Sequence, residues 1–377
     1  MRIVIVGAGP SGVISAILLK RKNPSFNVVI LEQLDRPLKK VTATGNGKCN
    51  FANKGNINAS TYSSIESLVT LSKYNFEKQI ELLHSLNIYE KLNGDLAYPI
   101  SESAQTVINS LLSECKRLGI EIITSVKVLD YEYRNNKYYI DTNVSKYDAD
   151  KIIFAVGGKS SPKLGSDGSL FNTFVNHGYK VSPMLPGLCP IKTVEKTKVL
   201  DGTRVKAKVS LWDNKTPIYE ENGEVLFKDH GLSGIVIFDL ASIIARYNKK
   251  YTHIELDILP FIGEATLKEF MAQNGREKFL NAYLHPNMQK YVENVKDQYL
   301  ASFVKHMPFT FNDFYGFEFS QVTVGGVSFD NVNNGFESTI EPNIYFVGEV
   351  MDNDGLCGGY NLMWAISSSM QLVDNIK

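Results

Sequence analysis

The chain has 377 residues, which is enough for about two or three domains and a sizeable core. Apolar residues make up 44% and charged residues 21%, and 40 Lys and Arg balance 40 Asp and Glu to give a formal net charge of zero. This composition is ordinary for a globular protein and provides no field that would gather polyanions. Binding to nucleic acid or to a membrane surface therefore has no electrostatic support, and we expect neither.

The cysteine pattern points to a reducing compartment. Four cysteines lie far apart, with no CxxC or CxxxxC pair: Cys49, Cys115, Cys189 and Cys357. We therefore expect no disulfide framework and a cytoplasmic location. Glycines break up the apolar run at the N-terminus, so we interpret this segment as mature sequence. No apolar stretch reaches the roughly 18 residues of a membrane-spanning helix. The six histidines show no paired spacing, so no metal site is predicted.

The N-terminal 32 residues have the pattern of a βαβ unit. Ile3–Val6 is a short apolar run typical of a buried parallel strand, and Ser11–Lys22 has the broad apolar face of a helix. Val28–Leu31 predicts a second strand, which ends at Glu32.

A glycine motif, Gly7-Ala8-Gly9-Pro10-Ser11-Gly12, joins the first strand to the helix. In this context Gly7 makes the tight turn, Gly9 lets backbone approach a pyrophosphate, and Gly12 lets helix and strand pack closely. Backbone N–H groups at the helix start then meet the diphosphate. Glu32 can accept hydrogen bonds from the adenosine ribose and would repel a 2′-phosphate. The candidate residues here are Gly7, Gly9, Pro10, Ser11, Gly12, Glu32 and Gln33.

Further elements follow in chain order. Thr42–Asn53 is a loop rich in Gly and Asn, Ser101–Leu118 predicts a helix, and strands are expected at Glu121–Asp130, Lys137–Thr142 and Lys151–Val156. The last of these runs into Gly157-Gly158. After Pro183–Pro190 the hydrophobic pattern changes from short apolar runs to alternation. Arg204–Trp212 alternates apolar and polar residues as a half-exposed antiparallel strand does. Strands are also expected at Gly223–Phe227 and Ile235–Asp239, and helices from Glu264 to about Lys305.

Near the C-terminus the sequence again has short apolar runs followed by glycines, as it has at the N-terminus. Strands are predicted at Val322–Val327 and Ile344–Val347, the second ending in Gly348-Glu349, and a closing helix at Gly359–Ile376. Glu349 is placed to hydrogen-bond a ribityl chain. An extended FAD needs such contacts far from the glycine motif, whereas NAD does not, so the sequence favours FAD.

Four motifs resemble one known family. They are Gly45-Asn46-Gly47-Lys48-Cys49-Asn50-Phe51-Ala52-Asn53, Gly223-Glu224-Val225-Leu226-Phe227 with Gly231-Leu232-Ser233-Gly234, Thr323-Val324-Gly325-Gly326-Val327, and Gly348-Glu349-Val350-Met351-Asp352 with Gly358-Gly359-Tyr360-Asn361. In this order they are similar to the BaiN-type NAD(P)/FAD-dependent oxidoreductases of bacteria and their aminoacetone-oxidase-like relatives. Asn46, Lys48 and Ala52 depart from the family pattern.

The resemblance implies an α/β fold: a Rossmann-like FAD domain of glutathione-reductase type, interrupted by a β-barrel-like insert with a helical subdomain. The expected divisions are 1–189 and 321–377 for the FAD domain and 190–320 for the insert, β-rich at 190–250 and 305–320 and helical at 260–304. It also implies further cofactor residues: Asn46, Gly47, Lys48, Cys49, Asn50, Val126, Ala155, Gly157, Gly158, Gly348, Glu349, Gly359, Tyr360, Asn361 and Leu362. The start of the last helix is expected to face the flavin ring.

These features predict an FAD-dependent oxidoreductase that exchanges a hydride with a small organic substrate. NAD(P)H-dependent reduction of an activated alkene is favoured, and an amine or alcohol oxidase using O₂ is the alternative. A third alternative is a flavin-carrying interaction or RNA-modification partner with little turnover. Only one full GxGxxG is present, so a nicotinamide donor would have to visit the flavin face itself. The sequence names no catalytic acid or base and no oligomeric state.

Overall fold

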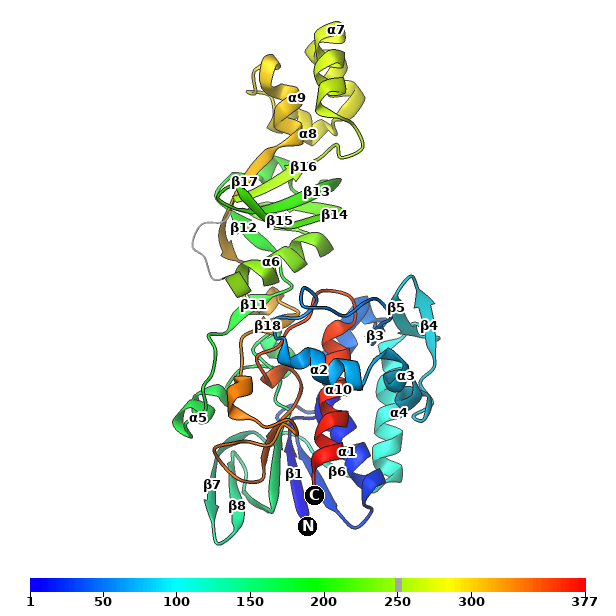
Figure 1. The fold of residues 1–377 in the computed structure, drawn as a ribbon, viewed down its shortest axis with the longest axis vertical. Helices are drawn as coiled ribbons and strands as arrows, with labels where there is room; N and C mark the ends of the chain where they lie inside the picture. Colours follow the sequence, from blue (N-terminus) through cyan, green and yellow to red (C-terminus); the bar gives the residue numbers. More distant parts are fainter. Residues whose placement is uncertain (248–252) are drawn as a thin grey trace. The chain divides into compact units, whose positions relative to one another are not determined.

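The computed structural model describes residues 1–247 and 253–377. The chain forms two compact units, one made of Met1–Leu185 with Val322–Lys377 and the other of Pro186–Gln321 (Figure 1). The divisions expected after residues 189 and 320 lie close to these. Each unit has its own cluster of buried apolar side chains.

The first unit is built on a parallel sheet with the strand order β19-β10-β1-β2-β6. The strands are β1 (Arg2–Val6), β2 (Asn27–Leu31), β6 (Glu121–Ile123), β10 (Lys151–Phe154) and β19 (Ile344–Phe346). Four of these strands, β1, β2, β10 and β19, are short apolar runs buried almost throughout, as expected for a parallel sheet covered on both faces. This arrangement confirms the predicted Rossmann-like architecture.

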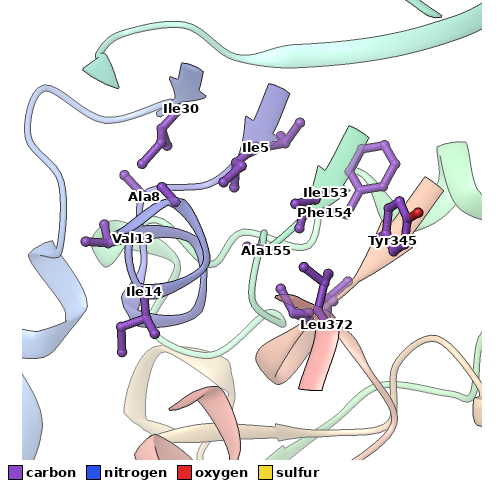
Figure 2. Close-up of a cluster of buried hydrophobic side chains, with 14 of the residues drawn as sticks. Ile5, Ala8, Val13, Ile14, Ile30, Ile153, Phe154, Ala155, Tyr345 and Leu372 are labelled. Carbon is purple, nitrogen blue, oxygen red and sulfur yellow. The ribbon is translucent and has the colours of Figure 1, made fainter. Parts of the chain in front are cut away.

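Two helices from opposite ends of the chain pack side by side against this sheet. They are α1 (Pro10–Lys22) and α10 (Tyr360–Asn375) (Figure 1). Ser369 Oγ of α10 donates to the backbone oxygen of Ser11 at 2.9 Å. Figure 2 shows Val13 of α1 and Leu372 of α10 beside Ile5 and Ile153 of the sheet. Because Tyr360 lies two and a half turns before Ser369, α10 extends about 14 Å beyond this contact.

The first unit also contains smaller sheets and helices. They are η1 (Lys39–Gly47), β3 (Ala52–Asn53), α2 (Glu66–Lys73), α3 (Phe76–His84), β4 (Glu90–Asn93), β5 (Leu96–Pro99), α4 (Ala104–Arg117), β7 (Val128–Arg134), β8 (Lys137–Thr142), β9 (Lys146–Ala149), α5 (Phe171–Asn176) and β18 (Val322–Val324). The single strand predicted at Glu121–Asp130 is wrong, because β6 and β7 are separate. Ser125 adopts a left-handed φ of 60°, which breaks the strand between them.

The second unit contains a closed antiparallel barrel with the strand order β12-β15-β14-β13-β16-β17. Its strands are β12 (Ile191–Thr193), β13 (Arg204–Asp213), β14 (Thr216–Lys228), β15 (Gly231–Ser233), β16 (His253–Asp257) and β17 (Met307–Phe314). As its alternation predicts, β13 pairs antiparallel with both of its neighbours. The short strand β11 (Leu185–Gly187) precedes the barrel.

Helix α6 (Ile235–Tyr247) corrects the strand predicted at Ile235–Asp239. The buried residues Val236, Ile237, Leu240 and Ala241 follow helical spacing, which continues to the buried Ile244 and Ala245. Three further helices occupy the region predicted to be helical: α7 (Glu264–Tyr283), α8 (Pro286–Tyr291) and α9 (Asp297–Lys305). Within the described part of the chain, no helix is both long and apolar enough to span a membrane.

Candidate functional site

The glycine motif forms a tight turn at the carboxyl edge of the parallel sheet. Gly7 adopts a φ of 103°, and its N–H donates to the backbone oxygen of Leu31 at 2.8 Å. A Cβ on Gly7 would lie 2.4 Å from the oxygen of Ala155, and a Cβ on Gly12 would lie 2.0 Å from the oxygen of Gly7. Both positions therefore exclude any side chain, because the backbone just after β10 and the turn itself occupy the space.

Gly9 differs from these two glycines. Its φ of −76° suits any residue, and a Cβ placed on it would meet nothing within 4 Å. It caps α1, where Pro10 holds the first helical position, as prolines commonly do. Among the described residues, the N–H groups of Ser11 and Gly12 have no hydrogen-bond partner. Open space, free N–H donors and the positive end of a 13-residue helix together form a cradle for an anion such as a diphosphate.

Glu32 lies directly after β2, beside this cradle, and is only 8% exposed. Its Oε2 accepts the N–H of Ala8 and its Oε1 accepts that of Leu34, both at 2.8 Å. Burial raises the pKa of the Glu32 carboxyl, although these backbone donors partly offset it. The Val126 N–H donates to the Glu32 backbone oxygen at 2.9 Å, and Gln33 Nε2 donates to the Gly165 oxygen. Glu32 and Val126 thus lie together beside the glycine turn.

We expect Glu32→Gln to weaken FAD binding by about 1.5–3 kcal/mol, the range for a hydrogen bond to a charged group. Gln keeps one acceptor oxygen but turns an amide NH2 toward either the Ala8 or the Leu34 N–H, so the apo protein should lose some stability and the FAD-bound protein should lose more. Titration of apo protein with FAD gives the affinity, and Tm with and without saturating FAD separates the two effects. Equal loss of Tm in both forms would assign Glu32 a structural role.

The turn after β10 packs against β18. The Ala155 N–H donates to the backbone oxygen of Val6 at 2.9 Å, and Gly157 adopts a left-handed φ of 69°. A Cβ on Gly158 would lie 2.3 Å from Thr323 Oγ1. That same oxygen accepts the N–H groups of Lys159 and Ser160 at 2.7 and 3.0 Å. The predicted residues Ala155, Gly157 and Gly158 therefore shape a close turn beside Gly7.

Glu349 follows β19 and reaches this turn. Its Oε2 pairs with Lys40 Nζ at 2.9 Å, and its Oε1 accepts from Ser160 Oγ at 2.9 Å and from the Thr323 N–H at 3.0 Å. Lys40 Nζ also donates to Ser160 Oγ. The sequence predicts Glu349 as a direct ribityl contact, whereas the structure engages both of its oxygens with protein donors. Sequence reasoning missed Lys40 and Ser160, and it named Thr323 as part of a motif without connecting it to Glu349.

The loop at Gly45–Asn50 is held in unusual backbone conformations, with φ values of 53° at Asn46, 84° at Gly47 and 60° at Cys49. A Cβ on Gly45 would lie 3.0 Å from the Asn50 nitrogen, so the loop folds tightly on itself. Lys48 points to an ion pair with Glu102 at 3.7 Å, and its side chain is 52% exposed. The structure therefore does not bring Lys48 to the glycine cradle.

All four cysteines are free thiols. Cys49 is 1% exposed, and burial raises the pKa of its thiol to about 11. A thiol with this pKa stays protonated at neutral pH and is a poor nucleophile. Packing is therefore the better interpretation of Cys49.

The segment before α10 lies against β3. Gly359 has a φ of 92°, and a Cβ on it would lie 2.8 Å from the Ala52 oxygen. The Asn361 side chain clamps Gly355, with Oδ1 accepting its N–H and Nδ2 donating to its oxygen, both at 2.9 Å. The Tyr360 oxygen accepts from Tyr62 Oη at 2.8 Å. In the described chain, the Asn361 and Leu362 N–H groups have no hydrogen-bond partner and remain available at the start of the helix.

The predicted residues thus form two groups. One surrounds the start of α1 and suits an adenosine diphosphate; the other surrounds the start of α10, about 14 Å farther along. The Lys40–Glu349 pair belongs to the first group, because Leu38 donates to the Ala8 oxygen and a Cβ on Gly348 would lie 2.4 Å from Ser11 Oγ. A ligand with a long extended shape fits this spacing, and FAD is such a ligand.

Comparison with known proteins agrees with this geometry. The HI0933-like protein Rossmann domain matches residues 1–373. The chain is 31% identical to a 3-dehydro-bile acid delta(4,6)-reductase of Clostridium scindens, over 97% of this chain and 96% of that protein. It is 26% identical to a ribosomal RNA dihydrouridine synthase of Escherichia coli, over 97% of this chain and 95% of that protein.

The fold is also similar to a solved structure, the 3-ketosteroid delta1-dehydrogenase of Sterolibacterium denitrificans. The TM-score is 0.54 at 9% identity, over 99% of this chain and 98% of that one. The resemblance predicted from the sequence motifs is confirmed by the family match and by the relative at 31% identity. The chain therefore belongs to the HI0933-like Rossmann-domain family and is an FAD-dependent oxidoreductase.

Proposed function

We propose that this protein reduces a carbon–carbon double bond conjugated to a carbonyl group in a small organic substrate. The observation that carries this proposal is the 31% identity, over nearly the whole of both chains, to an enzyme named for reducing the delta(4,6) double bonds of a 3-dehydro-bile acid. In such a substrate both double bonds are conjugated to the 3-oxo group, which makes the alkene an acceptor for hydride.

The second named relative supports the same bond type. Dihydrouridine differs from uridine by saturation of the C5–C6 double bond, which is conjugated to the C4 carbonyl. The two relatives thus differ in substrate size and agree in the kind of double bond they change. The zero net charge of this chain favours the small substrate over RNA.

The cofactor-binding roles follow from the contacts in the first unit. The start of α1, with Gly9, Ser11 and Gly12, would hold the FAD diphosphate, and Glu32 with Val126 would hold the adenosine. The start of α10 would donate Asn361 and Leu362 N–H groups toward the flavin end. When bound, FAD supplies the two-electron hydride chemistry that the side chains lack.

Anaerobic stopped-flow mixing tests the proposal. We expect NADH or NADPH to bleach the flavin absorbance, and a 3-oxo-4,6-diene steroid to restore it with a product two hydrogens heavier, in which one double bond is saturated, that mass spectrometry detects. The same reduced enzyme mixed with uridine-containing RNA provides the comparison between the two substrate types.

Two outcomes would contradict this proposal. Bleaching by an amine or alcohol, with none by a nicotinamide and rapid reoxidation by O₂, would establish an oxidase. Bleaching by a nicotinamide without reoxidation by any conjugated alkene would remove alkenes as the electron acceptor.

A further inference from the structure

Reduction of a conjugated alkene needs a proton as well as a hydride. The hydride adds to the β-carbon, and the α-carbon must then take a proton from an acid within hydrogen-bond reach. A side chain in this role must carry a proton at neutral pH, must be free to donate it, and must lie near the flavin end of the cofactor.

Tyr98 of β5 lies where the flavin-end segments meet. Its Cε1 would lie 3.5 Å from a Cβ on Gly45, and its hydroxyl is close enough to Cys357 and Glu102 for both to raise its pKa. Leu96, two residues earlier on the same face of β5, would lie 3.2 Å from a Cβ on Gly358. One face of β5 is therefore directed at both the Gly45–Asn50 loop and the segment that opens α10.

This place is set by the register of β5. Ala97 is fully buried and pairs with Ala52 of β3, and the Ala52 oxygen packs against Gly359 at the start of α10. The alternation of side chains along a strand then turns Leu96 and Tyr98 to the opposite face. Since α10 begins about 14 Å beyond the glycine cradle, Tyr98 lies at the end of the site that is remote from the diphosphate.

The hydroxyl of Tyr98 is unengaged. Across residues 1–247 and 253–377 it has no hydrogen-bond partner, although the side chain is half-buried. Tyr62, which also lies by the start of α10, differs in both respects: it is 2% exposed, and its hydroxyl donates to the Tyr360 oxygen. Tyr62 thus stabilises the start of α10, whereas the Tyr98 hydroxyl is free to donate its proton.

The surroundings of Tyr98 keep that proton in place. Partial burial, with the nearby Cys357 and Glu102, raises the pKa of the Tyr98 hydroxyl. Glu102 itself is held by Lys48 and Lys91, at 3.7 and 3.3 Å. The hydroxyl is therefore protonated throughout the neutral range, and its partly exposed side chain gives water access for reprotonation.

We propose that Tyr98 is the proton donor of the alkene reduction, an inference that rests on the function proposed above. Hydride from the reduced cofactor, itself reduced by a nicotinamide, forms the C–H bond at the β-carbon, and the π electrons move onto the carbonyl oxygen. The carbonyl then re-forms as the α-carbon takes the proton of Tyr98 Oη. The phenolate left behind is reprotonated by water, so two electrons and two hydrogens are added to the substrate.

Tyr98→Phe tests this role in the intact holoenzyme. We expect the reoxidation of reduced enzyme by a 3-oxo-4,6-diene steroid to slow by about 100-fold or more, the usual contribution of a general acid. The FAD content, the Tm and the rate of bleaching by a nicotinamide should stay as in the wild type. The wild-type rate should also remain flat up to about pH 10, because the hydroxyl ionises only above the ordinary tyrosine pKa.

Tyr89→Phe is the matched control, since Tyr89 is 51% exposed just before β4 and should leave every rate unchanged. If Tyr98→Phe reoxidises at the wild-type rate while the wild type reduces the steroid, Tyr98 is not the donor and the proposed function stands. If the wild type reduces no conjugated alkene, the function fails and the role of Tyr98 fails with it. Loss of FAD from Tyr98→Phe would instead make this residue part of the cofactor site.

Discussion

Gly9→Ser should leave the apo protein as stable as the wild type and weaken FAD binding by roughly 10- to 100-fold. The backbone at Gly9 suits serine, which is a preferred helix N-cap, and a Cβ there meets no protein atom within 4 Å. The only occupant that a new side chain can meet is the ligand. Overpacking of this kind costs about 1–3 kcal/mol, which corresponds to the expected change in Kd.

Gly12→Ala is the matched control for Gly9→Ser, because it lies three residues away in the same motif. Its Cβ would lie 2.0 Å from the Gly7 oxygen, and backbone cannot move aside cheaply. We expect a loss of about 3 kcal/mol or more in the free energy of unfolding, seen as a lower Tm with and without FAD. Calorimetry of both forms and FAD titration give the comparison. Equal apo stability of the two variants, or unchanged FAD affinity of Gly9→Ser, would contradict the cradle.

Lys40→Met should destabilise the apo protein by about 2 kcal/mol and also weaken FAD binding. Lys40 and Glu349 are 2.9 Å apart, with side chains 23% and 22% exposed, so removal of the lysine leaves a mostly buried carboxylate without its cation. Losing one member of a buried pair costs about 3–5 kcal/mol, and partial exposure reduces this. The remaining negative charge would then lie near the cradle that receives an anion.

The double variant Lys40→Met with Glu349→Gln separates pairing from other effects. Because the uncompensated charge is then gone, we expect it to recover about 1–2 kcal/mol relative to the sum of the single variants, in both Tm and FAD affinity. Lys39→Met is the control for apo stability: it removes the same charge one residue earlier, where Lys39 pairs with an Asp35 side chain that is 76% exposed. Its effect on FAD affinity is not compared, because Lys39 also lowers the pKa of Glu32. Additive losses in the cycle, or an equal effect of Lys39→Met, would show that the ion pair does not matter.

The sequence predicts most of the parallel sheet, because its strands are short apolar runs whose ends carry glycines. It fails at Ile235–Asp239, where a β-branched run is compatible with a strand or with the start of a buried helix, and only the following Leu240–Ala245 favours the helix. It also fails at Ser125, since a single left-handed residue leaves no periodic signal.

The candidate site likewise contains residues that the sequence predicts and residues that it does not. The glycine motif and Glu32 are local in sequence, so spacing alone brings them together. The partners of Glu349 are not: Lys40 is 309 residues away, in an unremarkable run of basic residues. Tyr98 has no motif, and its place follows from the pairing of Ala97 with Ala52, which is decided only when the chain folds.

The divided first unit has a consequence for synthesis on the ribosome. Ser11 receives its bond from Ser369, 358 residues later, and β10 lacks its outer neighbour β19 until Ile344–Phe346 has emerged. The barrel unit, Pro186–Gln321, is complete earlier and is one continuous segment. At about 5–20 residues per second, the nascent N-terminal portion therefore waits many seconds with the face that α10 will cover still uncovered. During that interval we expect the uncovered apolar surface to bind chaperones. We also expect FAD to bind with its full affinity only after translation ends.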